Sequence, residues 1–563
     1  MRRTSPEDGT ILWKGVHASM AHSTRAEKTL KSGSSQNGEI GIISLLLVAI
    51  LVGQFAVLCY FNFTQLRNHM GYDASWNFLR SALVWQDKAL VSSLWSETTN
   101  LHLDTHMVLT SLLYGITGNI LLAFGIGNTL MILVLLFLMW RILDRLEAPL
   151  HGKIIALNLM ICPYLMSGYS IFNDLGYFSN ILSSASYYTL RMSVILMIID
   201  EYLIIMQERK FGFLPWIVCP LCILCGFSSG VFLIVVILAP CLVYGIEMTV
   251  IRNDWKQLIR KESVFAYTCC AFVGMGKVLA LKIIGFTALD STRTWTSLRD
   301  LWKNFGAVIQ GFLKLLQVLP EVADDKPLMT VAGLSRVFIL VIFAVLVVAV
   351  VFSFRRVQRN RAEKSGAILF LVNIILVNFL VFGLYNAQYG ASIFEERYLI
   401  TSFYVAIILT ALLFGELAGK RVLSAMLSLA MAGSICAVNV YSDNTYLKTT
   451  NDAWQMDEIQ ALAETENAGV VYFWGEDLAV IRRALRPCDM NRVYKELPDN
   501  GGWFTHWGDY TTYDRFEEYS GPTLLICPRD QHLVPDSVLG EYTLIDTLDQ
   551  VEVYASDHNP RLF

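Results

Sequence analysis

Apolar segments of roughly 20 residues recur along most of this chain, and they constrain its fold more than any other feature. One such segment, folded as a helix, crosses a hydrocarbon core of about 30 Å. Charged residues make up 16% of the chain, against roughly 25% in soluble domains. We predict about 11 transmembrane helices, at residues 40–62, 118–140, 153–171, 191–207, 212–228, 230–250, 263–285, 336–354, 366–385, 398–416 and 422–441. The expected fold class is a polytopic α-helical membrane protein.

The distribution of Lys and Arg between these segments predicts their orientation. Five short loops, at 141–153, 208–211, 251–262, 355–364 and 420–421, hold 16 Lys and Arg among 41 residues. Such residues favour the cytoplasmic side of a membrane, and all five loops lie there if the N-terminus does too. An odd number of spans then places the C-terminus on the extracytoplasmic side. We expect a multi-pass protein of a bacterial plasma membrane.

Three domains follow from this layout. Residues 1–39 are polar and lack the apolar core of a signal peptide, so we expect a disordered cytoplasmic tail. Residues 40–441 form the transmembrane domain, with large outer loops at 63–107 and 286–335. Both loops contain amphipathic stretches, from Trp76 to Leu94 and from Trp295 to Leu316, with the spacing of helices that lie in the membrane interface.

The third domain, residues 442–563, is acidic and is predicted to be an extracytoplasmic α/β domain. It holds 22 acidic and 9 basic residues. Strands are predicted at Val470–Trp474 and Thr523–Cys527, with a helix at Glu476–Leu485 between them. Residues 542–545 and 551–554 are predicted to form a final hairpin.

Two features of this domain each have two interpretations. Trp503 and Trp507, in an aromatic run beside Asp and His, form either a surface for sugar stacking or a contact that packs the domain onto the membrane helices. Cys488 and Cys527 either form a disulfide, as an oxidising compartment permits, or stay reduced, with Cys527 buried in its strand. The sequence leaves both choices open.

Ionisable side chains within or beside membrane spans are costly and tend to be functional. Almost all of them here fall at the outer ends of the predicted spans. They are Asp73, Asp104, Arg191, Lys282, Arg336, Glu395, Glu396 and Arg397, with Lys277 deeper in its span. Acids and cations at one depth suit a reaction on a phosphate-bearing lipid. The acid takes a proton from the nucleophile, and the cations hold the phosphate.

Simpler interpretations of the same residues stay open. The arginines reach lipid head groups, Glu396 pairs with Arg397, and Asp73 caps a loop helix. Lys277 is at least six residues from either end of its span, so it pairs with a carboxylate or with a lipid phosphate. No nucleotide-binding loop is present, and no residues have metal-ligand spacing outside an apolar helix. We predict no metal site and no cofactor, although the acids are compatible with a divalent cation.

Several of these features together resemble the GT-C superfamily of integral-membrane glycosyltransferases. They are Tyr72-Asp73 soon after the first span, a large first outer loop with interfacial helices, Glu396-Arg397-Tyr398, and an outer C-terminal domain. The superfamily includes protein O-mannosyltransferases and bacterial aminoarabinose and arabinofuranosyl transferases. Its members often carry a second acid early in the loop, whereas Asp104 stands 31 positions after Asp73.

The resemblance implies transfer of a sugar from a polyprenyl-phosphate donor to an acceptor hydroxyl on the extracytoplasmic face. Asp73 is then the base or positions the acceptor. We predict Asp104 as a second catalytic acid, Arg191, Lys277 and Arg397 as ligands of the lipid phosphate, and Tyr72, Glu396, Trp503 and Trp507 as contacts of acceptor or sugar. The expected partners are this donor, a glycan, lipid or protein acceptor, and membrane lipid, with no nucleic acid.

Three other functions are weighed against this one. A lipid-linked polysaccharide polymerase or ligase usually has its large outer loop late in the chain, with arginines there, whereas these acids come early. A lipid or sugar transporter needs polar residues along a membrane pathway and an internal repeat, and only Lys277 lies deep in a span. An anchor that presents the C-terminal domain needs fewer spans.

Overall fold

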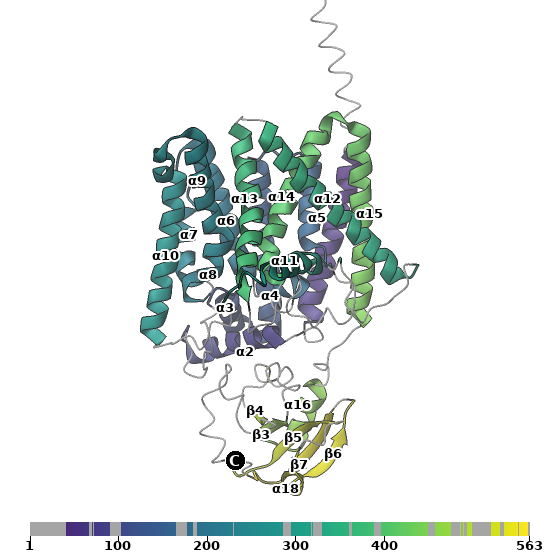
Figure 1. The fold of residues 1–563 in the computed structure, drawn as a ribbon. Coiled ribbons are helices and arrows are strands. Elements are labelled where there is room, and N and C mark those ends of the chain that lie inside the picture. Colours follow the sequence, from purple (N-terminus) through teal and green to yellow (C-terminus); the bar gives the residue numbers. More distant parts are fainter. Residues whose placement is uncertain are drawn as a thin grey trace, which may run out of the picture.

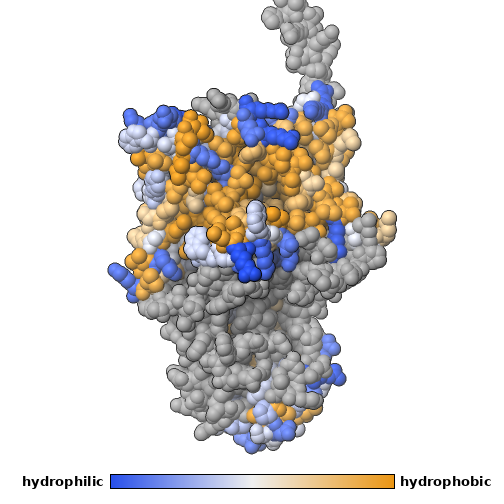
Figure 2. Space-filling model, viewed as in Figure 1, coloured by the Kyte–Doolittle hydropathy of each residue, from blue (hydrophilic) through white to orange (hydrophobic). Residues whose placement is uncertain are grey.

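The computed structural model describes residues 41–66, 70, 72–90, 103–164, 177–183, 188–228, 230–284, 294–316, 318, 329–359, 363–387, 396–448, 456–474, 485, 488, 492–497, 519–529, 534–549 and 551–560. Figure 1 shows a bundle of long helices with a small sheet beyond one end. A broad apolar band crosses the face of the bundle that Figure 2 shows, as expected for a surface that meets lipid. The predicted fold class is confirmed.

All eleven predicted spans contain helix. Among the described residues, eight helices are long and apolar enough to cross a membrane. They are Gly41–Thr64, Ile120–Arg145 (α4), Gly230–Arg252 (α8, Gly230–Leu233, η4, Ile234–Leu238, and α9, Ala239–Arg252), Lys261–Lys282 (in α10, Lys261–Ile284), Gly333–Arg359 (in α12, Val331–Arg359), Ser365–Leu384 (in α13, Glu363–Leu384), Glu396–Glu416 (η6, Glu396–Leu399, and α14, Ile400–Glu416) and Arg421–Asp443 (in α15, Arg421–Lys448). The other three predicted spans are α5 (Leu150–Ile161), α6 (Thr189–Glu208) and α7 (Pro215–Phe227). The helix of the predicted span 153–171 ends at Ile161, where the backbone turns extended at Cys162.

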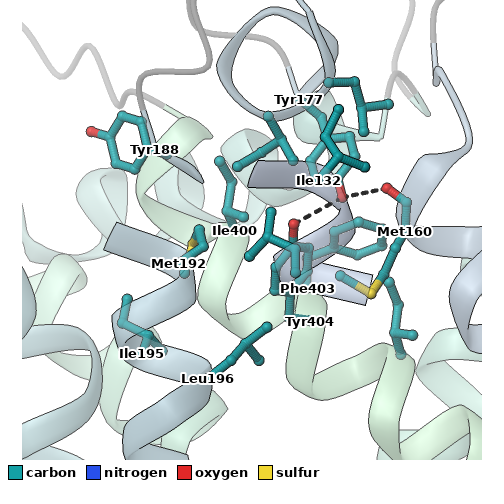
Figure 3. Packing of buried hydrophobic residues seen from close by; sticks show 14 of the residues in the cluster. Ile132, Met160, Tyr177, Tyr188, Met192, Ile195, Leu196, Ile400, Phe403 and Tyr404 are labelled. Atoms are coloured by element: carbon teal, nitrogen blue, oxygen red, sulfur yellow. Dashed lines mark hydrogen bonds between the residues drawn. The ribbon is translucent and has the colours of Figure 1, made fainter. Parts of the chain in front are cut away.

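Helices α6 and α14 form the centre of the bundle. Most residues of both helices are buried, because each helix is apolar around most of its circumference. Figure 3 shows how they pack. Tyr177 is the N-cap residue of η3 (Phe178–Leu182). Its hydroxyl donates to the Met160 carbonyl over 2.7 Å and lies 3.2 Å from the Tyr404 hydroxyl. These bonds satisfy polar groups that lipid cannot solvate.

The five basic loops meet at one end of the bundle, here called the basic end. Arg141 and Arg145 both bind the buried carboxylate of Asp200, at 2.9 and 3.0 Å. Further pairs join neighbouring loops, with Arg209 bound to Glu262 at 3.1 Å and Arg356 bound to Glu416. The loops that the orientation argument places on one side therefore lie together.

Helices α2 (Tyr72–Asp87) and α3 (Met107–Thr117) lie at the opposite end, here called the α2 end, where α2 crosses the bundle in Figure 1. Helix α11 (Leu301–Leu315) packs on α13 and η6. Its Asn304 side chain donates to the carbonyls of Phe382 and Gly383, and its Trp302 is 84% exposed. Both predicted amphipathic segments therefore contain a helix, although Trp295 lies in a strand before α11 and residues 91–94 lie outside the described residues. A short ladder joins β1 (Thr294–Trp295) to β2 (Tyr385–Ala387).

The C-terminal sheet has the strand order β4-β3-β5-β7-β6, with β4, β3 and β5 parallel and the last two strands antiparallel. Its elements are α16 (Met456–Thr465), β3 (Val470–Trp474), β4 (Val493–Leu497), β5 (Thr523–Pro528), α18 (Asp536–Leu539), β6 (Thr543–Thr547) and β7 (Val551–Ser556). The two predicted strands and the hairpin are confirmed. The predicted helix Glu476–Leu485 lies outside the described residues except for Leu485, which is helical.

Candidate functional site

A buried ion pair at the α2 end joins two of the residues singled out in the sequence. Arg191, in the first turn of α6, donates from Nε to Oδ2 of Asp104 over 2.6 Å and from Nη2 to Oδ1 over 3.0 Å. Both side chains are almost fully buried. A buried pair of this kind is stable only with good geometry, and two parallel bonds give the strongest form of an Arg–carboxylate contact.

The loop that carries Asp104 is fixed by its neighbours. The Leu103 amide donates to the Ser228 hydroxyl at the end of α7 over 3.0 Å. The Leu103 side chain packs with Val84 of α2 and Ala280 of α10. Asp104 therefore sits where α2, α7 and α10 converge.

Aromatic rings connect Arg191 to the start of α14. The Arg191 guanidinium lies over the Tyr188 ring, with Cζ 4.8 Å from its centroid. Tyr188 packs edge-on against Phe232, and Phe232 contacts Tyr398 of η6 with 6.0 Å between centroids. Tyr398 in turn stacks on Phe382 at 5.8 Å and 22°. The predicted motif Glu396-Arg397-Tyr398 and the Asp104–Arg191 pair are thus parts of one packed region.

Glu396 and Arg397 occupy η6 itself. The Glu396 side chain is buried and that of Arg397 is half-buried, with its guanidinium 6.0 Å from the Tyr398 ring. Ionisable side chains at such a position, next to a membrane span, tend to be functional.

Tyr72 and Asp73 are the first two residues of α2. The backbone places Asp73 inside the first helical turn, where the helix dipole favours a carboxylate. The interpretation of Asp73 as the N-cap is wrong, because the helix begins one residue before it. The side chains of both residues lie outside what the structure describes.

Lys277 lies in α10, three residues before Ala280, which packs in one cluster with Leu103 and with Val84 of α2. It is half-buried, and within the described part of the chain no carboxylate pairs with it. The predicted pairing of Lys277 with a carboxylate is therefore excluded among the described residues. The predicted pairing with a lipid phosphate stays a prediction.

Other predictions fall outside this region or outside the description. Trp503 and Trp507 lie outside the described residues. Cys488 and Cys527 are free thiols rather than a disulfide, with Cys527 buried in β5. Among the described residues, no group of three or more His, Cys, Asp or Glu side chains has the geometry of a metal site.

Sequence reasoning missed three members of the site, namely Tyr188, Ser228 and Phe232. Tyr188 precedes Arg191 by three residues, a spacing that places an aromatic ring and a cation on one face of a helix. That spacing was a usable signal. Ser228 and Phe232 lie in a stretch whose only visible feature was a turn, and their contacts reach across more than 100 and 160 residues of sequence, which no local pattern reports.

The fold was compared with solved structures. The crystal structure of ArnT from Cupriavidus metallidurans bound to undecaprenyl phosphate matches with a TM-score of 0.51 over 92% of this chain and 98% of that chain. The chain has the ArnT fold. ArnT in the apo state matches with a TM-score of 0.46 over 90% of this chain and 97% of that one.

Sequence identity to ArnT is 12% for the undecaprenyl phosphate complex and 13% for the apo state. The likeness to the undecaprenyl phosphate complex establishes the arrangement of helices and sheet, and the expected resemblance to GT-C proteins is confirmed for the fold alone. No protein-family model and no curated protein matches the sequence. The roles of individual side chains therefore rest on their own geometry.

Proposed function

We propose that this protein is a membrane glycosyltransferase that moves a sugar from a polyprenyl-phosphate donor to an acceptor hydroxyl. One observation carries the proposal. The chain shares its fold, over more than nine-tenths of both chains, with ArnT, which was crystallised with undecaprenyl phosphate. Acids and cations also gather at one end of the bundle, where a donor held in lipid and an acceptor from water can meet.

The reaction needs a base, a phosphate site and a leaving group. Asp73 removes the proton of the acceptor hydroxyl, which then attacks the anomeric carbon. The bond from that carbon to the phosphate oxygen breaks, and the polyprenyl phosphate leaves with the electron pair. Attack from the face opposite the leaving group inverts the configuration, and no nucleotide is required.

Arg191, Lys277 and Arg397 are the candidates to hold the lipid phosphate. Arg191 and Arg397 belong to the same packed region, and Lys277 lies on α10, where no described carboxylate neutralises it. Cations in such a site stabilise the negative charge that develops on the leaving phosphate. Tyr72, Glu396, Trp503 and Trp507 are proposed to contact the acceptor or the sugar. A divalent cation is not part of this mechanism.

The proposal includes an orientation. The basic end faces the cytoplasm, because Lys and Arg favour that side, and the α2 end with the acidic domain 442–563 faces the extracytoplasmic side. Residues 1–39 are then a cytoplasmic tail. The setting that fits best is glycan or glycoconjugate assembly in a bacterial cell envelope.

The test replaces Asp73 and a matched residue of the same helix. Asp73→Asn keeps the shape and removes the base, so transfer in proteoliposomes that contain a polyprenyl-phosphate sugar should fall by about 100-fold or more. Asp87→Asn makes the same change at the far end of α2 and should leave the rate within about twofold of wild type. Transfer by Asp73→Asn at the wild-type rate would remove Asp73 as the base.

A further inference from the structure

The edge of Arg191 that best fits a phosphate is already occupied by a carboxylate. We propose that Asp104 holds this edge in the absence of donor, and that the phosphate of the donor displaces it. Asp104 is then a positioning residue that sets donor affinity, rather than a group that takes a proton from the acceptor. The inference rests on the proposed function, since it assigns the regulation of the same site.

The geometry carries this assignment. Nε and Nη2 of a guanidinium form a planar fork, and here both donate to the two oxygens of one carboxylate, at 2.6 and 3.0 Å. Arginine binds two oxygens of a phosphate in the same way. A phosphate that binds this edge must therefore take the positions of Oδ1 and Oδ2 of Asp104.

The two partners differ in how firmly they are held. Arg191 belongs to the buried helix α6 and lies over the Tyr188 ring. Asp104 lies outside any helix, in residues 103–106 just before α3, where one described bond, from the Leu103 amide to the Ser228 hydroxyl, ties this stretch to α7. An exchange therefore requires movement of a loop and leaves the helix in place.

Because Arg191 is buried, the Nε–Nη2 edge of its guanidinium needs an anion as a partner. The Arg191 side chain is 6% exposed and the Asp104 side chain is 0% exposed. A guanidinium in such surroundings is strongly destabilising without an anion. Asp104 supplies that anion when no donor is present, and the phosphate supplies it after exchange, so the charge of Arg191 stays compensated while the displaced Asp104 carboxylate must leave its buried position.

The first experiment measures binding of undecaprenyl phosphate alone, without sugar or turnover, to the full chain in lipid nanodiscs. Asp104→Asn keeps the volume of the side chain and removes the competing charge. It should tighten the dissociation constant by about tenfold or more, because the phosphate then displaces a neutral amide oxygen instead of a carboxylate that is ion-paired with the guanidinium. Unchanged or weaker binding by this variant would mean that Asp104 orients Arg191 and does not compete.

Asp200→Asn is the matched control. It also removes a carboxylate that is 0% exposed and bound to arginine, but at the basic end of the bundle. It should leave the affinity for undecaprenyl phosphate unchanged. An equal gain in both variants would contradict a local exchange at Arg191.

A second measurement uses the wild-type protein, so it does not depend on folding of a variant. Dicyclohexylcarbodiimide, an apolar reagent for carboxyl groups, should label Asp104 faster once undecaprenyl phosphate is added, while labelling of Asp200 stays constant. No increase at Asp104 would overturn the exchange. If the wild type binds no undecaprenyl phosphate at all, the proposed function fails and the exchange fails with it, whereas binding without displacement refutes the exchange alone.

Discussion

Three uncharged side chains in the interior of the bundle make a sharp test of how this membrane domain is held together. Gln54 of the first helix donates to Oδ1 of Asn158 in α5 over 2.6 Å. Asn439 of α15 donates to Oε1 of the same glutamine over 2.8 Å. Gln54 thus joins the first helix to two others. We predict that Asn158→Leu destabilises the protein by about 2 kcal/mol.

The magnitude follows from what each bond leaves behind. Asn158 also donates to the carbonyls of Leu47 and Ile154, at 3.0 and 2.9 Å, but both acceptors lie in helices and keep their backbone partners. The loss therefore comes from Gln54. Interhelical hydrogen bonds in membranes average about 0.6 kcal/mol, and a donor left unpaired in the interior costs about 1–3 kcal/mol more.

The clearest test of this prediction combines substitutions at all three positions. The triple variant Gln54→Met, Asn158→Leu and Asn439→Leu leaves no orphaned donor, and replacement of all partners by apolar groups of similar shape is nearly neutral. It should therefore be more stable than Asn158→Leu alone. Reversible unfolding in mixed micelles or by steric trapping gives the free energies. A triple variant whose destabilisation equals the sum of the three single changes would refute the reasoning.

Two further predictions concern packing and titration. Gly276→Leu should lower the thermal stability and the yield of the folded protein, because a Cβ there would collide with the Ile223 carbonyl of α7, whereas Gly274→Leu, with nothing within 4 Å, should be tolerated. Burial raises the pKa of the Cys527 thiol to about 12 from 9.0. The buried protonated thiol therefore contributes fully to the stability of the folded state below pH 9, and this contribution is lost as the pH rises toward 12. At pH 10 the free energy of unfolding is about 1.4 kcal/mol lower, on this account, than below pH 9. Cys527→Ala should therefore make the unfolding temperature less dependent on pH in this range. An equal dependence in wild type and variant would contradict the raised pKa.

The parts of the fold that the sequence predicts well are those with a strong local signal. Long apolar runs predict the membrane helices, and the continuous run Val470–Trp474 predicts β3, which is buried along its whole length. Strand β4, Val493–Leu497, was missed because Lys and Glu interrupt its apolar pattern at the edge of the sheet. Helix α16 was missed because only Met456, Ile459 and Ala463 face the core.

The candidate site shows a different limit. Asp104 and Arg191 were each singled out because charge beside a membrane span is costly, but their pairing joins residues 87 positions apart and no periodicity predicts it. The bonds of Gln54 were missed for another reason. Amides carry no charge, so a search for ionisable groups passes over them, although an unpaired amide in a membrane interior is also expensive.

The paired arginines at the two ends of the bundle differ in how much of each side chain is exposed to water. This difference affects which reactant can bind beside them. At the basic end, Arg141 and Arg145 pair with Asp200 while 35% and 20% of their side chains stay exposed, so water shares in their solvation. At the α2 end, the Arg191 side chain is 6% exposed and is enclosed by Asp104 and Tyr188. An enclosed guanidinium rejects neutral ligands, because binding one in place of an anion leaves the charge uncompensated. Of the two reactants in the proposed transfer, only the polyprenyl-phosphate donor is necessarily an anion at its reacting end, so we propose that this arrangement selects the donor and that the acceptor is chosen elsewhere.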